Sequence, residues 1–118
     1  MRRTAIIIED DLLIAFELED ILHELDFTVG GTFVTENDAV AGAFSQKPDL
    51  LLVDYRLAQG DGASAVERIR LQQAARVVYV SASGEEVLRR EPDAIHVDKP
   101  FDRNRIAAAI DRAFHDAG

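Results

Sequence analysis

Short runs of apolar residues alternate along this chain with stretches in which apolar residues return every three or four positions. Apolar runs bounded by polar groups are typical of buried parallel strands, and a three-to-four spacing is typical of helices that face a sheet. This alternation predicts βαβ units. We therefore expect one α/β domain over residues 1–118, with a doubly wound, five-stranded parallel sheet. The predicted strands are residues 4–8, 27–33, 49–54, 76–81 and 94–97.

Four of the predicted helices turn a clear apolar stripe toward the sheet. The first follows Asp10 or Asp11, and the second begins at a capping threonine, Thr35. Ser64 and Glu67 form the pattern of a capping box for the third, and Asp102 precedes the fifth as its cap. The expected core stripes are Ile14, Leu18, Ile21, Leu22 and Leu25; Ala39, Val40, Ala43 and Phe44; Ala65, Val66 and Ile69; and Ile106, Ala109, Ile110 and Phe114.

The fourth predicted helix is unusually short. Ser83 could cap it, but only residues 85–90 can be helical before Pro92, because a proline disfavours helical backbone in the residue before it. We expect a shortened fourth helix of about one turn, or a disordered segment.

Composition excludes several classes of function. The chain has no cysteine, so disulfides and thiolate metal sites are excluded. No apolar stretch approaches the length of a membrane span or of a signal peptide, so we expect a cytoplasmic protein with no membrane partner. The net charge is −9, with 13 acidic and 4 basic side chains in residues 1–62 against 9 and 9 in residues 63–118. Because phosphate contacts need basic surface, we expect no nucleic-acid partner.

The most informative residues stand where predicted strands end. Asp54 closes the run Leu50-Leu51-Leu52-Val53, the pair Glu9-Asp10 follows the first strand, and Lys99 follows the last. In an open α/β sheet the carboxyl ends of the strands meet at one edge, where ligands bind. Several carboxylates and one ammonium at one edge suit a hard cation together with a phosphoryl group, and Mg²⁺ prefers such oxygen ligands.

With these residues the chain resembles the receiver domain of bacterial two-component response regulators, over nearly all 118 residues. The resemblance implies a flavodoxin-like (βα)5 fold. It rests on five motifs in the right order, at near-family spacing: Ile6-Ile7-Ile8-Glu9-Asp10-Asp11, Leu52-Val53-Asp54-Tyr55-Arg56-Leu57, Gly60-Asp61-Gly62, Val80-Ser81-Ala82 and Asp98-Lys99-Pro100-Phe101.

The resemblance implies specific roles at the edge of the sheet. Asp54 would be the phosphoacceptor, although a carboxylate after a strand can also be a simple cap. Mg²⁺ would be held directly by Asp10, by Asp54 and by the backbone carbonyl of Arg56, with Glu9 acting through water. Lys99 would pair with Asp54 at rest and with a phosphoryl oxygen after transfer. The alternative is a surface lysine with no role in the site.

Two further residues match the family's switch. Ser81 would donate its hydroxyl to a phosphoryl oxygen, and the alternative is an ordinary loop serine. His96 stands where the family usually has tyrosine or phenylalanine, and it is either a rotameric switch with a pH-dependent charge or a partly exposed strand histidine without a role. Arg56 and Ser83 occupy positions that in the family tune how fast phosphate is lost. In the family, the region of the short fourth helix belongs to the surface that changes on activation.

The expected partners are a histidine kinase or a histidine phosphotransfer protein as phosphoryl donor, and an unknown downstream protein. The resemblance places donor docking on the first helix. The apolar stripe predicts that a second set of its residues faces away from the sheet, and exposed apolar side chains there suit a small helix-packing interface. This predicted partner-binding set is Asp11, Leu12, Ala15, Phe16 and Glu19.

Two other function classes compete with a phosphoacceptor. One is a pseudo-receiver, an interaction module that works without phosphorylation, and the complete set of site residues argues against it. The other is an enzyme such as a phosphatase with an aspartate nucleophile, which would need an additional acid or a cap domain that the sequence does not show. We therefore expect a regulator rather than a turnover enzyme, either stand-alone or excised from a longer chain.

Overall fold

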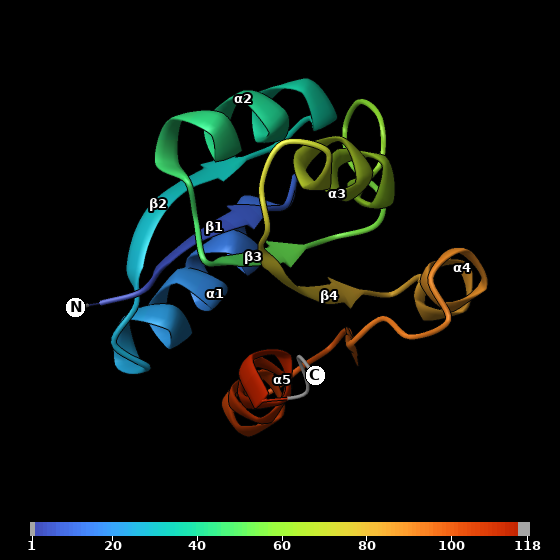
Figure 1. Cartoon of the computed structure of the whole chain (residues 1–118). Coiled ribbons are helices and arrows are strands. Elements are labelled where there is room, and N and C mark those ends of the chain that lie inside the picture. Colours follow the sequence, from blue (N-terminus) through green and yellow to red (C-terminus); the bar gives the residue numbers. More distant parts are fainter. Residues whose placement is uncertain (1, 116–118) are drawn as a thin grey trace.

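The computed structural model describes residues 2–115, which form one parallel sheet between two layers of helices (Figure 1). The strands lie in the order β2-β1-β3-β4-β5, and all four strand pairs are parallel. The elements along the chain are β1 Thr4–Ile8, α1 Leu12–Glu24, β2 Thr28–Phe33, α2 Glu36–Gln46, β3 Leu50–Val53, α3 Gly62–Arg70, β4 Arg76–Ser81, α4 Gly84–Arg90, β5 His96–Asp98 and α5 Arg103–His115. The doubly wound α/β fold predicted from the sequence is confirmed.

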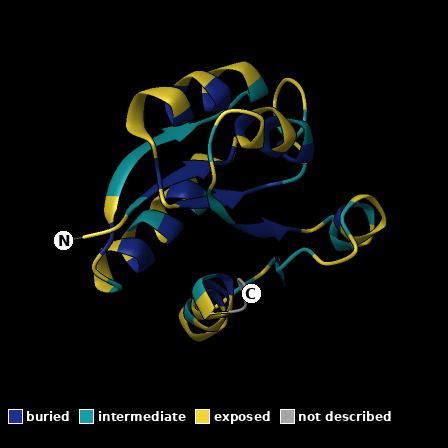
Figure 2. Cartoon of the chain, viewed as in Figure 1, coloured by how far each residue is buried: buried dark blue, intermediate teal, exposed yellow. Residues whose placement is uncertain are grey.

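The sheet separates two apolar cores. One core packs alternate strand residues such as Ile7 and Leu52 against α1 and α5, and the other packs Ile6 and Leu51 against α2, α3 and α4. Figure 2 shows the central strands buried and the helices buried only along their inner sides. Because β1 and β3 are covered on both faces, their residues are apolar without alternation, as expected for central parallel strands.

The pairing of β1 with β3 brings the acidic motifs together. Ile8 is in register with Val53, so both strands end at the same level. The next residues continue the alignment, because the Asp54 amide donates to the Ile8 carbonyl at 2.8 Å and the Glu9 amide donates to the Phe33 carbonyl at 3.0 Å. Glu9, Asp10 and Asp54 therefore leave the sheet side by side.

The caps of α2 and α5 are those that the sequence predicts, and the cap of α3 is not. Thr35 and Asp102 accept amide hydrogen bonds at the starts of α2 and α5, as predicted. The capping box at Ser64 is wrong: α3 starts at Gly62, and Asp61 is the cap, accepting from the Ser64 amide at 2.7 Å. Asp11, one of the two residues after which the first helix was expected to begin, is the cap of α1.

Two other predictions need correction. Phe44 was placed in the α2 core stripe, but 44% of its surface is exposed. The last strand starts at His96 rather than at residue 94, because Pro92 and a hydrogen bond from the Ala94 amide to the Glu91 carbonyl hold the chain in a turn there.

The fourth helix is short, as predicted, but its 7 residues make about two turns rather than one. It buries only Val87 among its side chains. The Ser83 side chain makes no cap hydrogen bond there. No helix among residues 2–115 is long and apolar enough to span a bilayer.

Candidate phosphoacceptor site

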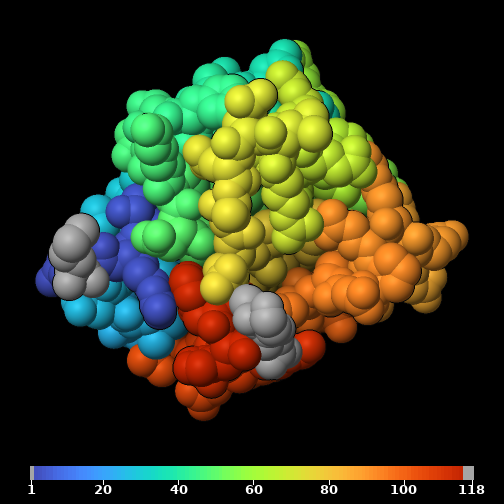
Figure 3. All heavy atoms as spheres, in the orientation of Figure 1, coloured from blue at the N-terminus to red at the C-terminus, as the bar shows by residue number. Residues whose placement is uncertain are grey.

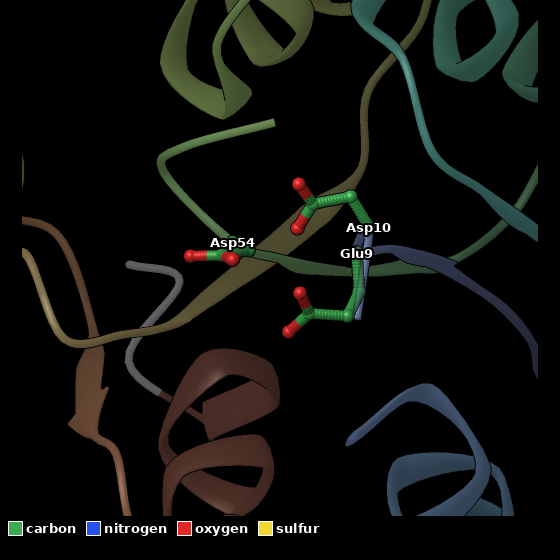
Figure 4. A group of neighbouring side chains, drawn as sticks. All are labelled: Glu9, Asp10 and Asp54. Carbon is green, nitrogen blue, oxygen red and sulfur yellow. The ribbon is translucent and has the colours of Figure 1, made fainter. Parts of the chain in front are cut away.

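Three carboxylates gather where β1 and β3 end (Figure 4). One oxygen each of Glu9, Asp10 and Asp54 lies within 4.8 Å of the other two. Glu9 and Asp54 are almost fully buried, with 1% and 8% of their surfaces exposed, while Asp10 is open to solvent. Carboxylates held this close repel one another, and the arrangement favours binding of a cation.

Lys99 supplies the nearest positive charge. Its Nζ lies 2.7 Å from Glu9 Oε1 and donates to Asp54 Oδ2 at 3.1 Å. Burial by itself would lower the pKa of Lys99, but the contacts with Glu9 and Asp54 outweigh it, so the pKa of Lys99 is raised. The ammonium group therefore stays charged at neutral pH. The structure places Lys99 within reach of both buried carboxylates, whereas the sequence suggested Asp54 alone.

Glu9 carries the strongest sign of an incomplete charge balance. Burial raises the pKa of Glu9 from its ordinary value of 4.5 to about 7, and Asp54 adds to the rise against the opposing effects of Lys99 and the Asp11 amide. Glu9 Oε2 accepts from that amide at 3.1 Å, but Oε1 is buried without an aligned hydrogen bond. Three carboxylates around the Lys99 ammonium leave an excess of negative charge, which fits a hard cation such as Mg²⁺.

Ser81 is the last residue of β4, and His96 is the first residue of β5. Ser81 is buried, and its Oγ accepts from the Ser83 amide at 2.9 Å. His96 Nε2 lies 3.1 Å from the Ser81 carbonyl oxygen, which can only accept, so Nε2 carries the proton. The imidazole packs closely against Gly84, where an added Cβ would lie 2.5 Å from ring atom Cε1. The side chain of His96 is 10% exposed, which agrees with a partly exposed strand histidine, and its role as a switch stays a prediction.

Arg56 points away from the carboxylates, toward α4. Its Nε donates to Ser83 Oγ at 3.2 Å, and its guanidinium pairs with Glu86. The carbonyl role of Arg56 stays a prediction. Sequence reasoning missed Glu86, because a partner 30 residues away has no local signal.

Gly62 belongs to the motif Gly60-Asp61-Gly62, and its small size fixes the loop that follows Asp54. A Cβ on this residue would lie 2.0 Å from the Asp54 carbonyl oxygen, and its amide donates to the Tyr55 carbonyl at 2.7 Å. Gly62 therefore allows the start of α3 to lie directly against the backbone of the acceptor. The close approach could not be read from a Gly-Asp-Gly triplet, which is common in turns.

The outward side of α1 differs in part from its prediction. Leu12 and Phe16 are 57% and 62% exposed, as expected, and Asp11 is exposed, while Glu19 is half-buried. The prediction that Ala15 faces away from the sheet is wrong. Ala15 is buried, because it precedes Leu18 by three residues and shares the core stripe. Sequence reasoning missed Leu13, the most exposed apolar side chain of α1 at 75%.

Comparison with known proteins decides the family. The family model of the response regulator receiver domain matches residues 5–111. The chain belongs to this family. Its relatives include PhyR of Methylorubrum extorquens, which is 36% identical over 118 residues, covering 96% of this chain and 44% of PhyR. PdtaR of Mycobacterium tuberculosis is 30% identical, covering 94% of this chain and 56% of PdtaR.

Solved structures agree with this assignment. The receiver domain of PhyR from Erythrobacter litoralis superposes with a TM-score of 0.89 at 32% identity, covering 96% of this chain and 90% of that one. PhyR from Brucella abortus gives a TM-score of 0.88 at 32% identity, with 99% and 50% covered. The chain spans about half the length of the curated relatives PhyR and PdtaR. It is a receiver domain of two-component signalling.

The balance of charge at the receiver site can be tested without a partner. In metal-free protein, Lys99→Met should lower the free energy of unfolding by about 2 kcal/mol, because it leaves two buried carboxylates without a counter-charge. Mg²⁺ should restore part of this loss. Urea unfolding with and without Mg²⁺ measures both effects. Lys47→Met, at an exposed helix end, is the matched control and should change stability by less than about 0.5 kcal/mol. Equal losses in the two variants, or no recovery with Mg²⁺, would contradict this charge balance.

Proposed function

We propose that this receiver is a cytoplasmic phosphoacceptor, in which Asp54 takes a phosphoryl group from a histidine kinase or a histidine phosphotransfer protein. The observation that carries the proposal is the placement of Asp54, a buried carboxylate within 4.8 Å of two others and 3.1 Å from a lysine. If Asp54 were only a structural cap, it would need neither the acid pair Glu9-Asp10 nor Lys99 beside it.

The residues suit a direct transfer. A carboxylate oxygen of Asp54 attacks the phosphorus of a phosphohistidine, an O–P bond forms, the P–N bond breaks, and its electron pair returns to the donor imidazole. Asp10, Asp54, the Arg56 carbonyl and, through water, Glu9 would hold Mg²⁺, which supplies positive charge against the phosphoryl oxygens. Lys99 and the Ser81 hydroxyl would donate to the transferred group. The domain then acts as a regulator with slow self-dephosphorylation rather than as a turnover enzyme.

The acceptor can be identified by intact mass. Incubation with acetyl phosphate should give one Mg²⁺-dependent phosphoryl adduct in wild type and none in Asp54→Asn, because the amide lacks the nucleophilic oxygen. Asp61→Asn, which keeps a cap oxygen outside the carboxylate cluster, is the control and should form the adduct.

An adduct that persists in Asp54→Asn would move the acceptor to another residue. No adduct, together with no binding of beryllofluoride, would support the pseudo-receiver class instead.

His96 is proposed to pass the state of the site to α4. Its ring contacts both the Ser81 carbonyl and Gly84, the first residue of α4. A movement of Ser81 toward a phosphoryl group would therefore move the ring against Gly84. The downstream target is open. PhyR of Bartonella quintana is titled an anti-anti-sigma factor, which makes a protein of sigma-factor regulation the first class of target to test.

NMR of the beryllofluoride-loaded protein tests the role of His96. In wild type, loading should shift amide resonances near Asp54 and in α4. In His96→Ala the shifts near Asp54 should remain, while those of residues 84–90 should fall to less than about half, because the ring that joins Ser81 to Gly84 is gone. His23→Ala, an exposed residue of α1, is the control. Full α4 shifts in His96→Ala would show that the ring has no switch role.

The exposed residues Leu12, Leu13 and Phe16 of α1 are proposed to dock the phosphoryl donor. They lie on the first two turns of α1, which starts two residues after the exposed Asp10, so a donor helix packed there would lie near the acceptor edge. Glu19 follows these residues on α1 and would add charge selectivity.

A transfer assay separates docking from chemistry. The variant Leu12→Ser, Phe16→Ser, Glu19→Lys should receive phosphate from a phosphorylated kinase or phosphotransfer protein at least about tenfold more slowly, the equivalent of ~1.4 kcal/mol of lost contacts. Its labelling by acetyl phosphate should not change, since the small donor needs no docking surface. The control carries Phe44→Ser and Leu71→Ser, two exposed apolar residues elsewhere. Unaltered kinase transfer in the α1 variant would reject this surface.

A further inference from the structure

Three buried side-chain atoms among residues 2–115 lack an aligned hydrogen bond: Glu9 Oε1, which keeps its ion pair with Lys99 at 2.7 Å, Arg76 Nε and Tyr79 Oη. The first belongs to the acidic cluster described above. The other two belong to residues that line one hollow beside the first half of β4. Buried polar groups in proteins are nearly always paired. Two donors without an aligned hydrogen bond at one place are therefore unusual, and they call for an acceptor.

The hollow exists because β5 is short. Pairing with β4 starts only at Tyr79 and His96, so the edge of β4 before Tyr79 is left open. The chain before β5 forms one wall, and the end of α3 and the last turns of α5 form the others. In Figure 3 these three segments, coloured orange, yellow and red, meet on the face in view. The volume, about 290 Å³, is at the lower end of the range for small-molecule sites.

The donors are held in place by their surroundings. Arg76 Cζ lies 5.7 Å from the ring centre of Phe114, which supports the guanidinium. Burial raises the pKa of the Tyr79 hydroxyl, and the nearby Glu91 carboxylate raises it further, so this hydroxyl remains a donor at any physiological pH. Arg70 stands at the rim, where it pairs with Glu91 at 3.5 Å.

We propose that this hollow is a second binding site, for a small oxyanion such as a carboxylate or a phosphate, with Arg76 and Tyr79 as its inner donors. An oxyanion offers several acceptor oxygens, and a guanidinium with a neighbouring hydroxyl matches them. Arg70 would exchange its partner Glu91 for the ligand, or share it. The site does not depend on Asp54 or on the proposed phosphoryl transfer.

Occupancy of the hollow would act on the link between α4 and β5. Glu91 ends α4, and residues 93–95 lead into β5, so an anion bound here would tie this link to β4 and to α3. The proposed site is thus placed to influence α4 from the side opposite His96.

The test is an amide NMR titration of metal-free protein with inorganic phosphate and, separately, with succinate. Saturable shifts should appear at residues 76–79 and 91–95, and the anion that saturates at lower concentration identifies the preferred chemistry. Tyr79→Phe and Arg76→Gln should each weaken binding at least about tenfold. Arg105→Gln, an exposed arginine of α5 outside the hollow, and Asp54→Asn should leave the affinity unchanged.

Tyr79→Phe removes one hydroxyl and keeps the buried ring, so this variant should fold, and it decides the case even if Arg76→Gln does not fold. Shifts that rise without saturation for both anions would overturn the site. So would an affinity that is the same in Tyr79→Phe as in wild type.

Discussion

The structure depends on forcing like charges together. The apolar strands β1 and β3 pair in the middle of the sheet, and Ile8 and Val53, both fully buried, fix where each ends. The acids that follow cannot move apart without unpairing the two strands. Two unit charges 4.8 Å apart, the upper limit of the separation between these carboxylate oxygens, repel by on the order of 3 kcal/mol at an effective dielectric constant of about 20. Burial of these strands thus keeps the carboxylates close enough to repel one another, and a cation bound at this edge lowers that repulsion.

Lys99 and Ser81 link the carboxylate cluster to the last strands of the sheet. Lys99 Nζ reaches the carboxylates, while the amide of the same residue donates to the Ser81 carbonyl at 3.3 Å. That carbonyl also accepts from His96 Nε2. One backbone oxygen is therefore shared between the residue that balances the charge and the residue that packs on α4. In the proposed switch, a redistribution of charge around Asp54 would act on both residues through this one oxygen.

The sequence predicts what depends on neighbouring residues and fails where distant segments decide. The strands and the acidic motifs follow from runs of apolar residues and from the rule that parallel strands end together. The cap of α3 could not be predicted in this way, since Asp61 and Ser64 are both good caps. The choice is made by Gly62, which must lie against the Asp54 carbonyl. Ala15 was misplaced because an alanine gives little hydrophobic signal in a helix whose outward side also carries leucines.

The position of α4 was beyond the sequence for a different reason. A helix of 7 residues has no stability of its own, and one buried valine anchors it weakly. Polar contacts do the rest: Arg56 reaches Glu86, and Arg90 reaches Asp61 at 3.0 Å. Exposed ion pairs of this kind contribute roughly 0–1 kcal/mol each and depend on exact geometry. Rearranging α4 therefore costs little compared with unpairing any strand. The part of the receiver that is least fixed by its core lies next to the charged edge, so a change at Asp54 meets the least resistance there.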